Sequence, residues 1–122
     1  MARVAVLCSD LLFGSKLVAA LEGSGHQVWL LDTGEQARGA APESDLLIVD
    51  LTAEELDGPG LVRSLRESGE LGEVPTLGFY AHVDQETRRR ADQAGFDRVV
   101  PRSRMAREAA ALAGGLVGGR RA

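Results

Sequence analysis

The chain has 122 residues, of which 44% are hydrophobic and 26% charged, and its formal net charge is −4. This composition is typical of one folded domain and excludes an intrinsically disordered chain. No apolar run approaches the ~20 residues that cross a bilayer, and the first residues do not read as a secretion signal. Cys8 is the single cysteine, which excludes an internal disulfide. We therefore expect a cytoplasmic domain with no membrane segment.

The charge is divided unevenly along the chain. Residues 1–84 carry a net charge of −9, whereas residues 85–122 carry nine arginines against four acids, a net charge of +5. A basic segment of this kind can bind nucleic acid or an acidic surface of another protein. A solvated arginine surface explains it more simply, and we do not expect a nucleic-acid partner.

Five short apolar runs recur along the chain, and each is continuous rather than alternating. Strands of a parallel sheet have such continuous apolar runs when helices cover both faces of the sheet. The predicted strands are Val4–Leu7, Val28–Leu31, Leu46–Leu51, Thr76–Phe79 and Arg98–Val100.

A segment with helical spacing follows each predicted strand. In the first, Leu17, Ala20 and Leu21 share one face, and the glycine-rich stretch 23–25 ends the helix. The second, around Glu35–Ala40, is short and flanked by glycine, so it predicts only a weak helix.

The last three helices have clearer signals. Leu61, Val62 and Leu65 form an apolar stripe, with Pro59 in the first turn of that helix. The fourth helix is expected from about Asp84, as N-cap, to a stop at Gly95, and the fifth is expected to begin after Ser103. Their apolar faces are Ala91 and Ala94, and then Ala109, Leu112 and Leu116.

Strand followed by helix, five times over, predicts an α/β fold with a doubly wound, five-stranded parallel sheet. Two arrangements fit, the flavodoxin-like (βα)5 order 2-1-3-4-5 and a half-Rossmann order. Both place function at the carboxyl ends of the strands. We expect one domain over residues 1–117 and a flexible, glycine-rich tail at residues 118–122.

The turn after the first strand reads CSDLLFG, which lacks the G-x-G-x-x-G of a dinucleotide-binding site. Asp32, at the end of the second strand, matches the acid that binds ribose in such sites, but the glycines that a dinucleotide-binding site also needs are missing. Ser9 and Ser15 offer slight support for a flavin phosphate loop.

The third strand and its surroundings carry a more specific pattern. Residues 45–51 read DLLIVDL and are followed by Asp57-Gly58; Val74-Pro75 precedes the fourth strand, and Gly95-Phe96-Asp97 precedes the fifth. Gly25-His26-Gln27-Val28 leads into the second strand, and Ala81 follows the fourth. This pattern resembles the CheY-like receiver domain of response regulators over roughly residues 3–117.

The resemblance implies five functional positions. Receivers bind Mg²⁺ through an acidic pair after the first strand and accept a phosphoryl group on an aspartate that ends the third. A small hydroxyl and a lysine then grip the phosphoryl oxygens. The matching positions in this chain are Cys8 and Ser9, with Asp10 one place late, then Asp50, Tyr80 and Arg102.

Only Asp50 keeps the residue type that the resemblance implies, so we expect no metal or other cofactor, and Mg²⁺ only if the site is active. Asp10 is expected to cap the first helix. Arg102 keeps the positive charge, and we expect it to pair with Asp50, which would fill the site.

Three side chains leave alternatives open. Cys8 is expected to be buried and inert rather than a redox sensor, and His82 to be a surface residue rather than a base or metal ligand. Tyr80 is either core filling or the anchor of an interface.

We therefore expect an atypical receiver, or pseudo-receiver, that is not an enzyme and acts as a phosphorylation-independent protein–protein interaction module in bacterial signalling. Its interaction face would be the fourth helix, fifth strand and fifth helix, which bind a signalling protein or a second copy. That face carries Arg88, Arg98, Arg104 and Arg107.

Two rival functions remain. One is a working receiver of a two-component system, in which Asp50 is phosphorylated and Asp10 and Ser9 recruit Mg²⁺. The other is a small-molecule or flavin-binding module that uses the same strand ends.

Overall fold

The computed structural model describes residues 2–81 and 85–120, and within them five parallel strands form one sheet. The strand order is β2-β1-β3-β4-β5, so the flavodoxin-like prediction is confirmed and the half-Rossmann order is not observed. The strands are β1 (Arg3–Leu7), β2 (Gln27–Leu31), β3 (Leu46–Asp50), β4 (Thr76–Tyr80) and β5 (Arg98–Pro101).

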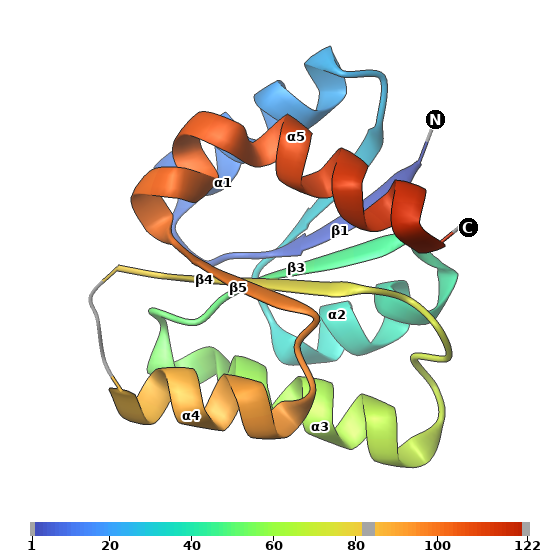
Figure 1. Cartoon of the computed structure of the whole chain (residues 1–122), viewed down its shortest axis with the longest axis vertical. Coiled ribbons are helices and arrows are strands. Elements are labelled where there is room, and N and C mark those ends of the chain that lie inside the picture. The colour runs from blue at the N-terminus through green and yellow to red at the C-terminus, as the bar shows by residue number, and fades with distance from the viewer. Residues whose placement is uncertain (1, 82–84, 121–122) are drawn as a thin grey trace.

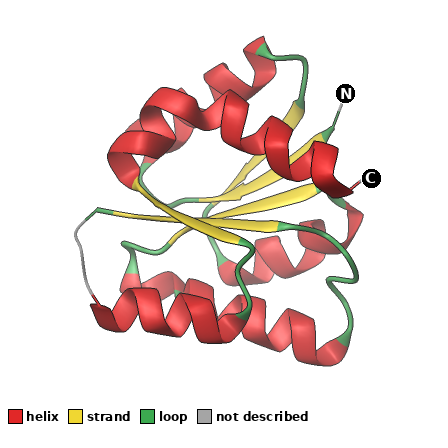
Figure 2. Ribbon diagram, viewed as in Figure 1, coloured by secondary structure: helices red, strands yellow, loops and turns green. Residues whose placement is uncertain are grey.

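Helices cover both faces of this sheet (Figures 1 and 2). On one face lie α1 (Leu11–Gly23) and α5 (Arg102–Arg120), and on the other lie α2 (Gly34–Ala40), α3 (Gly58–Ser68) and α4 (Gln85–Ala94). Short 3₁₀ turns, η1 (Ala41–Glu43) and η2 (Glu54–Leu56), precede β3 and α3. None of the helices in the described ranges combines the length and apolar character that crossing a membrane requires.

The continuous apolar runs reflect burial on both faces. Every residue of β3 and β4 is buried, and alternate residues point to opposite faces. Ile48 belongs to the cluster under α1 and α5, whereas Leu47 and Val49 belong to the cluster under α2, α3 and α4. The three-layer arrangement thus explains why these strands show no alternation of polar and apolar residues.

The helices differ from expectation in three details. Ala20 is exposed, and the side chain that completes the buried face of α1 is Phe13. Helix α4 begins at Gln85, and its expected cap, Asp84, lies outside the described residues. Helix α5 begins at Arg102 and runs to Arg120, into the stretch expected as a tail, while residues 121–122 lie outside the described part.

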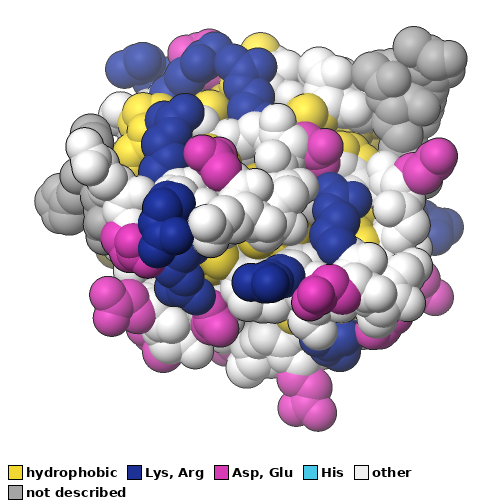
Figure 3. Space-filling model, turned by 60° about the horizontal axis from the view of Figure 1, so that its bottom comes forward, with side chains coloured by type: hydrophobic (Ala, Val, Ile, Leu, Met, Phe, Trp, Pro, Cys, Tyr) yellow, Lys and Arg dark blue, Asp and Glu magenta, His cyan; other side chains and the backbone are white. Residues whose placement is uncertain are grey.

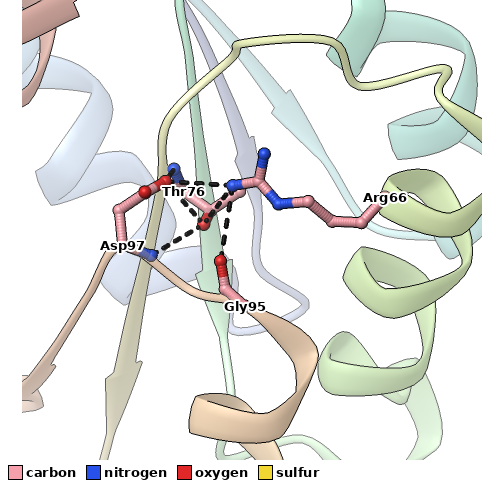
Figure 4. A network of polar contacts seen from close by, with 4 residues as sticks. All are labelled: Arg66, Thr76, Gly95 and Asp97. Atoms are coloured by element: carbon pink, nitrogen blue, oxygen red, sulfur yellow. Dashed lines mark hydrogen bonds and ion pairs between the residues drawn. The ribbon is translucent and has the colours of Figure 1, made fainter.

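A polar network joins three elements at the amino ends of the last two strands (Figure 4). Asp97 Oδ2 accepts hydrogen bonds from the Thr76 backbone N–H at 2.7 Å and from Arg66 Nη2 at 3.0 Å. Thr76 Oγ1 accepts from the Asp97 N–H at 3.1 Å, and Arg66 also reaches the carbonyl of Gly95 at 3.4 Å. The network fixes the turn that enters β5 against β4 and α3.

Candidate functional site

The carboxyl ends of the strands bring the predicted site residues to one edge of the sheet. Cys8 follows β1, Asp50 ends the adjacent β3, and Tyr80 ends β4. Arg102 begins α5 directly after β5, and Asp10 begins the turn into α1. The topology therefore brings four of the five positions that the resemblance selected to this edge, together with Asp10. The remaining position, Ser9, is exposed in the loop between Cys8 and Asp10.

Asp50 is buried, with 2% of its surface exposed, and both carboxylate oxygens have neighbours. Oδ1 accepts a hydrogen bond from the Thr52 backbone N–H at 2.8 Å, and Oδ2 lies 3.6 Å from Cys8 Sγ, whose thiol donates to it. The carboxylate thus holds the loop after β3 and contacts the end of β1.

Arg102 pairs with Asp10, so the expected pair with Asp50 was wrong. Its Nη2 lies 2.5 Å from Asp10 Oδ2, and its guanidinium carbon lies 4.1 Å from the centre of the Phe13 ring. The physical reason is that Asp10 and Phe13 offer a partly solvated ion pair and a cation–π contact together. Reaching Asp50 would require the guanidinium to lose its hydration in the buried end of the site.

Phe13 is the site residue that sequence reasoning missed. Its ring lies beneath Arg102 and is tilted against Phe79, with the ring centroids 5.1 Å apart. Its position three residues after the Asp10 cap, on the inner face of α1, was the available signal.

Asp10 caps α1, as expected from the sequence. Its Oδ1 accepts a hydrogen bond from the Phe13 backbone N–H at 3.1 Å. This hydrogen bond, and next the contact with Arg102, lower the pKa of the Asp10 carboxyl below its usual value. Asp10 is therefore charged at neutral pH, and both of its oxygens are engaged within the chain.

Cys8 is buried, with 2% of its surface exposed. Burial, followed by the charge of Asp50, raises the pKa of the Cys8 thiol from 9.0 to about 11. The thiol is therefore neutral at physiological pH, which agrees with the inert cysteine predicted and makes a redox sensor a poor interpretation.

The residues at this edge do not fit a magnesium ion. Mg²⁺ prefers charged oxygen ligands, but the positions of the acidic pair hold a neutral thiol and the hydroxyl of Ser9. Across residues 2–81 and 85–120, no three histidine, cysteine or acidic side chains gather as a metal site.

Tyr80 fills the core on the α3 and α4 side of the sheet and is 9% exposed. Arg88 Nη1 lies 3.5 Å from its hydroxyl oxygen. Of the two alternatives left open, core filling is the one observed. The other residue considered after β4, His82, lies outside the described residues.

The arginines of the predicted interaction face are engaged to different degrees. Arg104 and Arg107 contact Glu108 at 3.4 and 4.0 Å, and Arg88 contacts Tyr80. The side chain of Arg98 is exposed and has no hydrogen bond or ion pair with any other described residue.

The underside of the molecule, where α3 and α4 lie, carries basic and acidic side chains interspersed rather than separated (Figure 3). Arg89 pairs with Glu86, and Arg90 pairs with Asp57 at 2.7 Å. The consecutive arginines of α4 therefore do not form an uncompensated basic patch.

No protein-family model matches the sequence, and no curated protein does so either. The solved structures give a clear likeness. The receiver domain of Francisella response regulator 1452 matches with a TM-score of 0.84 at 18% identity, over 98% of each chain. The receiver domain of the sensor histidine kinase PA1611 from Pseudomonas aeruginosa PAO1 matches with a TM-score of 0.84 at 22% identity, over 96% of this chain and 98% of that one.

The fold is that of a response-regulator receiver domain. A third similar structure, a CheY-like receiver domain protein from Methanospirillum hungatei JF-1, has a TM-score of 0.84 at 14% identity, over 99% of this chain and 97% of that one. The PA1611 receiver domain has a magnesium ion coordinated in its active-site cleft. In the present chain, the carboxyl edge of the sheet holds the Cys8–Asp50 and Asp10–Arg102 contacts described above.

Proposed function

We propose that this domain is a pseudo-receiver, a phosphorylation-independent protein–protein interaction module of bacterial signal transduction that works in the cytoplasm and turns over no substrate. One observation carries the proposal. The carboxylates of Asp50 and Asp10, which lie at or beside the receiver positions, are both engaged within the chain, Asp50 with Thr52 and Cys8, and Asp10 with Arg102.

The chemistry of phosphoryl transfer supports this proposal. An aspartate that attacks a phosphoryl group brings together several negative charges, which a metal ion must offset. Here the neighbour of Asp50 is a thiol with its pKa raised to about 11, and the nearby acid Asp10 already has a cationic partner. Neither arrangement recruits a divalent cation.

The partner would bind the face formed by α4, β5 and α5, and would be a signalling protein or a second copy of this domain. The exposed Arg98 of β5 is the strongest candidate contact, because its guanidinium has no partner among the described residues. Charged groups at the rim of an interface steer association and set specificity. An acidic partner surface is therefore the complementary one.

The test is thermal unfolding with and without Mg²⁺ and beryllofluoride, which together mimic a phosphoryl group on aspartate. A ligand at one hundred times its dissociation constant would stabilise the fold by about 2.7 kcal/mol, which is several degrees for a domain of this size. We expect no shift in the wild-type domain. The Asp50→Ala variant is the matched control, and it should also bind the partner as the wild type does.

A rise of the melting temperature that needs both components and disappears in Asp50→Ala would contradict the proposal. That outcome would identify a working receiver in which Asp10 and Ser9 recruit the metal. An absorbance band of a bound chromophore in the purified protein would instead favour the flavin-binding alternative.

A further inference from the structure

The two open edges of the sheet are unequal. The outer strand β5 carries the exposed Arg98 and ends in Pro101, which has no backbone N–H to donate. Charges and prolines are the usual means by which proteins prevent edge strands from pairing with other chains. The other outer strand, β2, reads QVWLL and carries neither, and its Trp29 is 36% exposed.

The backbone of β2 has hydrogen-bonding groups that face outward. The Gln27 N–H donates to the Ala2 carbonyl at 2.8 Å, and the Leu31 carbonyl accepts from the Cys8 N–H at 2.9 Å, so these residues face β1. The N–H and C=O groups of alternate strand residues point to opposite sides. Those of Val28 and Leu30 therefore point to the open edge.

The side chains of β2 are incompletely covered on both faces. Val28 and Leu30 lie under α1 and are only partly buried, and with α1 they line an open groove of about 350 Å³. The α1 residues of that groove are Ser15, Val18, Ala19 and Glu22. On the other face, α2 makes its main contacts with β1, α3 and η1, and the Trp29 side chain is 36% exposed.

We propose that β2 pairs in antiparallel fashion with β2 of a second copy of this chain, about a two-fold axis that passes between the two Trp29 residues. In this register Val28 lies opposite Leu30 of the second copy. The outward N–H and C=O groups of each residue then form hydrogen bonds with those of the other. Trp29 lies opposite itself, where cross-strand aromatic pairs are favourable. The two sheets then form one continuous sheet.

The charges beside the edge are self-complementary, as a two-fold interface requires. On α1, the exposed Lys16 and Glu22 lie three residues on either side of Ala19, and neither side chain has a partner among the described residues. Antiparallel packing of α1 on its copy about the small Ala19 brings Lys16 to Glu22 of the second copy. The strand register also sets His26 opposite Asp32 of the second copy.

The test is the oligomeric state of the full chain as a function of concentration, measured by sedimentation equilibrium. Trp29 is the single tryptophan, so its fluorescence should shift to shorter wavelength as the dimer forms. We expect Trp29→Lys, which places like charges opposite each other, to raise the dimer dissociation constant at least about tenfold. Lys16→Glu and Glu22→Lys should each weaken the dimer, and the double charge swap should restore it.

The control is Arg98→Glu on the opposite edge, which should leave the dimer intact. A chain that stays monomeric at every concentration would overturn the proposal. So would a dimer that survives Trp29→Lys and both single charge changes but is lost in Arg98→Glu, since that dimer would use the α4–β5–α5 face. The charge-swap series keeps the test decisive if Trp29→Lys fails to fold.

Discussion

At the scale of single residues, the contact between Cys8 and Asp50 explains how the site can be stable without a cation. A second carboxylate in place of Cys8 would face Asp50 at short range, and two such charges cannot both ionise without compensation. The Cys8 thiol instead stays neutral and donates a hydrogen bond to Asp50 Oδ2. The side chain that replaces an acid thus removes the charge that a metal would offset.

The raised pKa of Cys8 predicts slow alkylation. With a pKa of about 11 in place of 9.0, the thiolate fraction at pH 8 falls roughly 100-fold, because only the thiolate reacts. We expect iodoacetamide to modify the folded protein at least that much more slowly than the urea-unfolded protein. The folded-state rate should rise with pH up to about pH 11.

The Asp50→Asn variant is the control for the cause of this shift. The charge of Asp50 raises the pKa of Cys8, so its removal should speed alkylation at pH 8 while burial still keeps the rate below that of the unfolded chain. Equal rates in the folded and unfolded wild type would show that Cys8 is exposed and ionises normally.

At the scale of elements, the strands could be predicted because burial on both faces leaves a continuous apolar run that the sequence displays directly. Each predicted strand agrees with the observed one to within a residue at either end. The first helix was harder, since its buried face includes Phe13 in the first turn, before the stripe that starts at Leu17. Helical spacing alone also placed Ala20 inside, but it is exposed.

The site shows where such prediction ends. The topology placed Asp50, Cys8 and Arg102 at one edge, because the carboxyl ends of parallel strands share that edge. Arg102 pairs with Asp10 rather than with Asp50 because the Phe13 ring lies beneath its guanidinium and because Asp50 is buried. Those are properties of three-dimensional packing between residues far apart in the chain, so the sequence pattern did not contain them.

The link between β4 and β5 predicts the effect of Thr76→Val. The hydroxyl of Thr76 is fully buried and donates to Asp97 Oδ2 at 3.2 Å. It accepts from the Asp97 N–H at 3.1 Å and from Arg66 Nη2 at 3.3 Å. Valine keeps the shape but removes all three contacts, so we expect the free energy of unfolding to fall by about 1–2 kcal/mol. Urea unfolding followed by circular dichroism measures the change.

Arg66→Met provides the comparison for this variant. Arg66 is partly exposed, and its Nη2 forms an ion pair with Asp97 at 3.0 Å. The same atom makes longer contacts with Thr76 Oγ1 at 3.3 Å and with the Gly95 carbonyl at 3.4 Å. Partly solvated pairs of this kind stabilise weakly. We expect a loss smaller than that of Thr76→Val. If the arginine variant were the less stable of the two, the network would depend on charge rather than on the buried hydroxyl.

At the scale of the whole molecule, the burial of the strands decreases from the centre of the sheet to its edges. Strands β1, β3 and β4 lie between two strands each, with helices on both sides, whereas β2 and β5 each have one neighbouring strand. The residues of β2 are all exposed or partly buried, in contrast to those of β3. Stability should therefore be distributed unevenly across one cooperative domain.

Amide hydrogen exchange should reveal this gradient. In dilute solution the N–H groups of Val28 and Leu30 point to solvent at the open edge, so we expect them to exchange at least about 100-fold faster than those of Ile48 and Val49, which should open only on global unfolding. Heteronuclear NMR after transfer to D₂O measures each amide. Equal protection of Val28 and Val49 at high dilution would contradict the expectation, because it would require the β2 edge to be covered within a single copy of the chain.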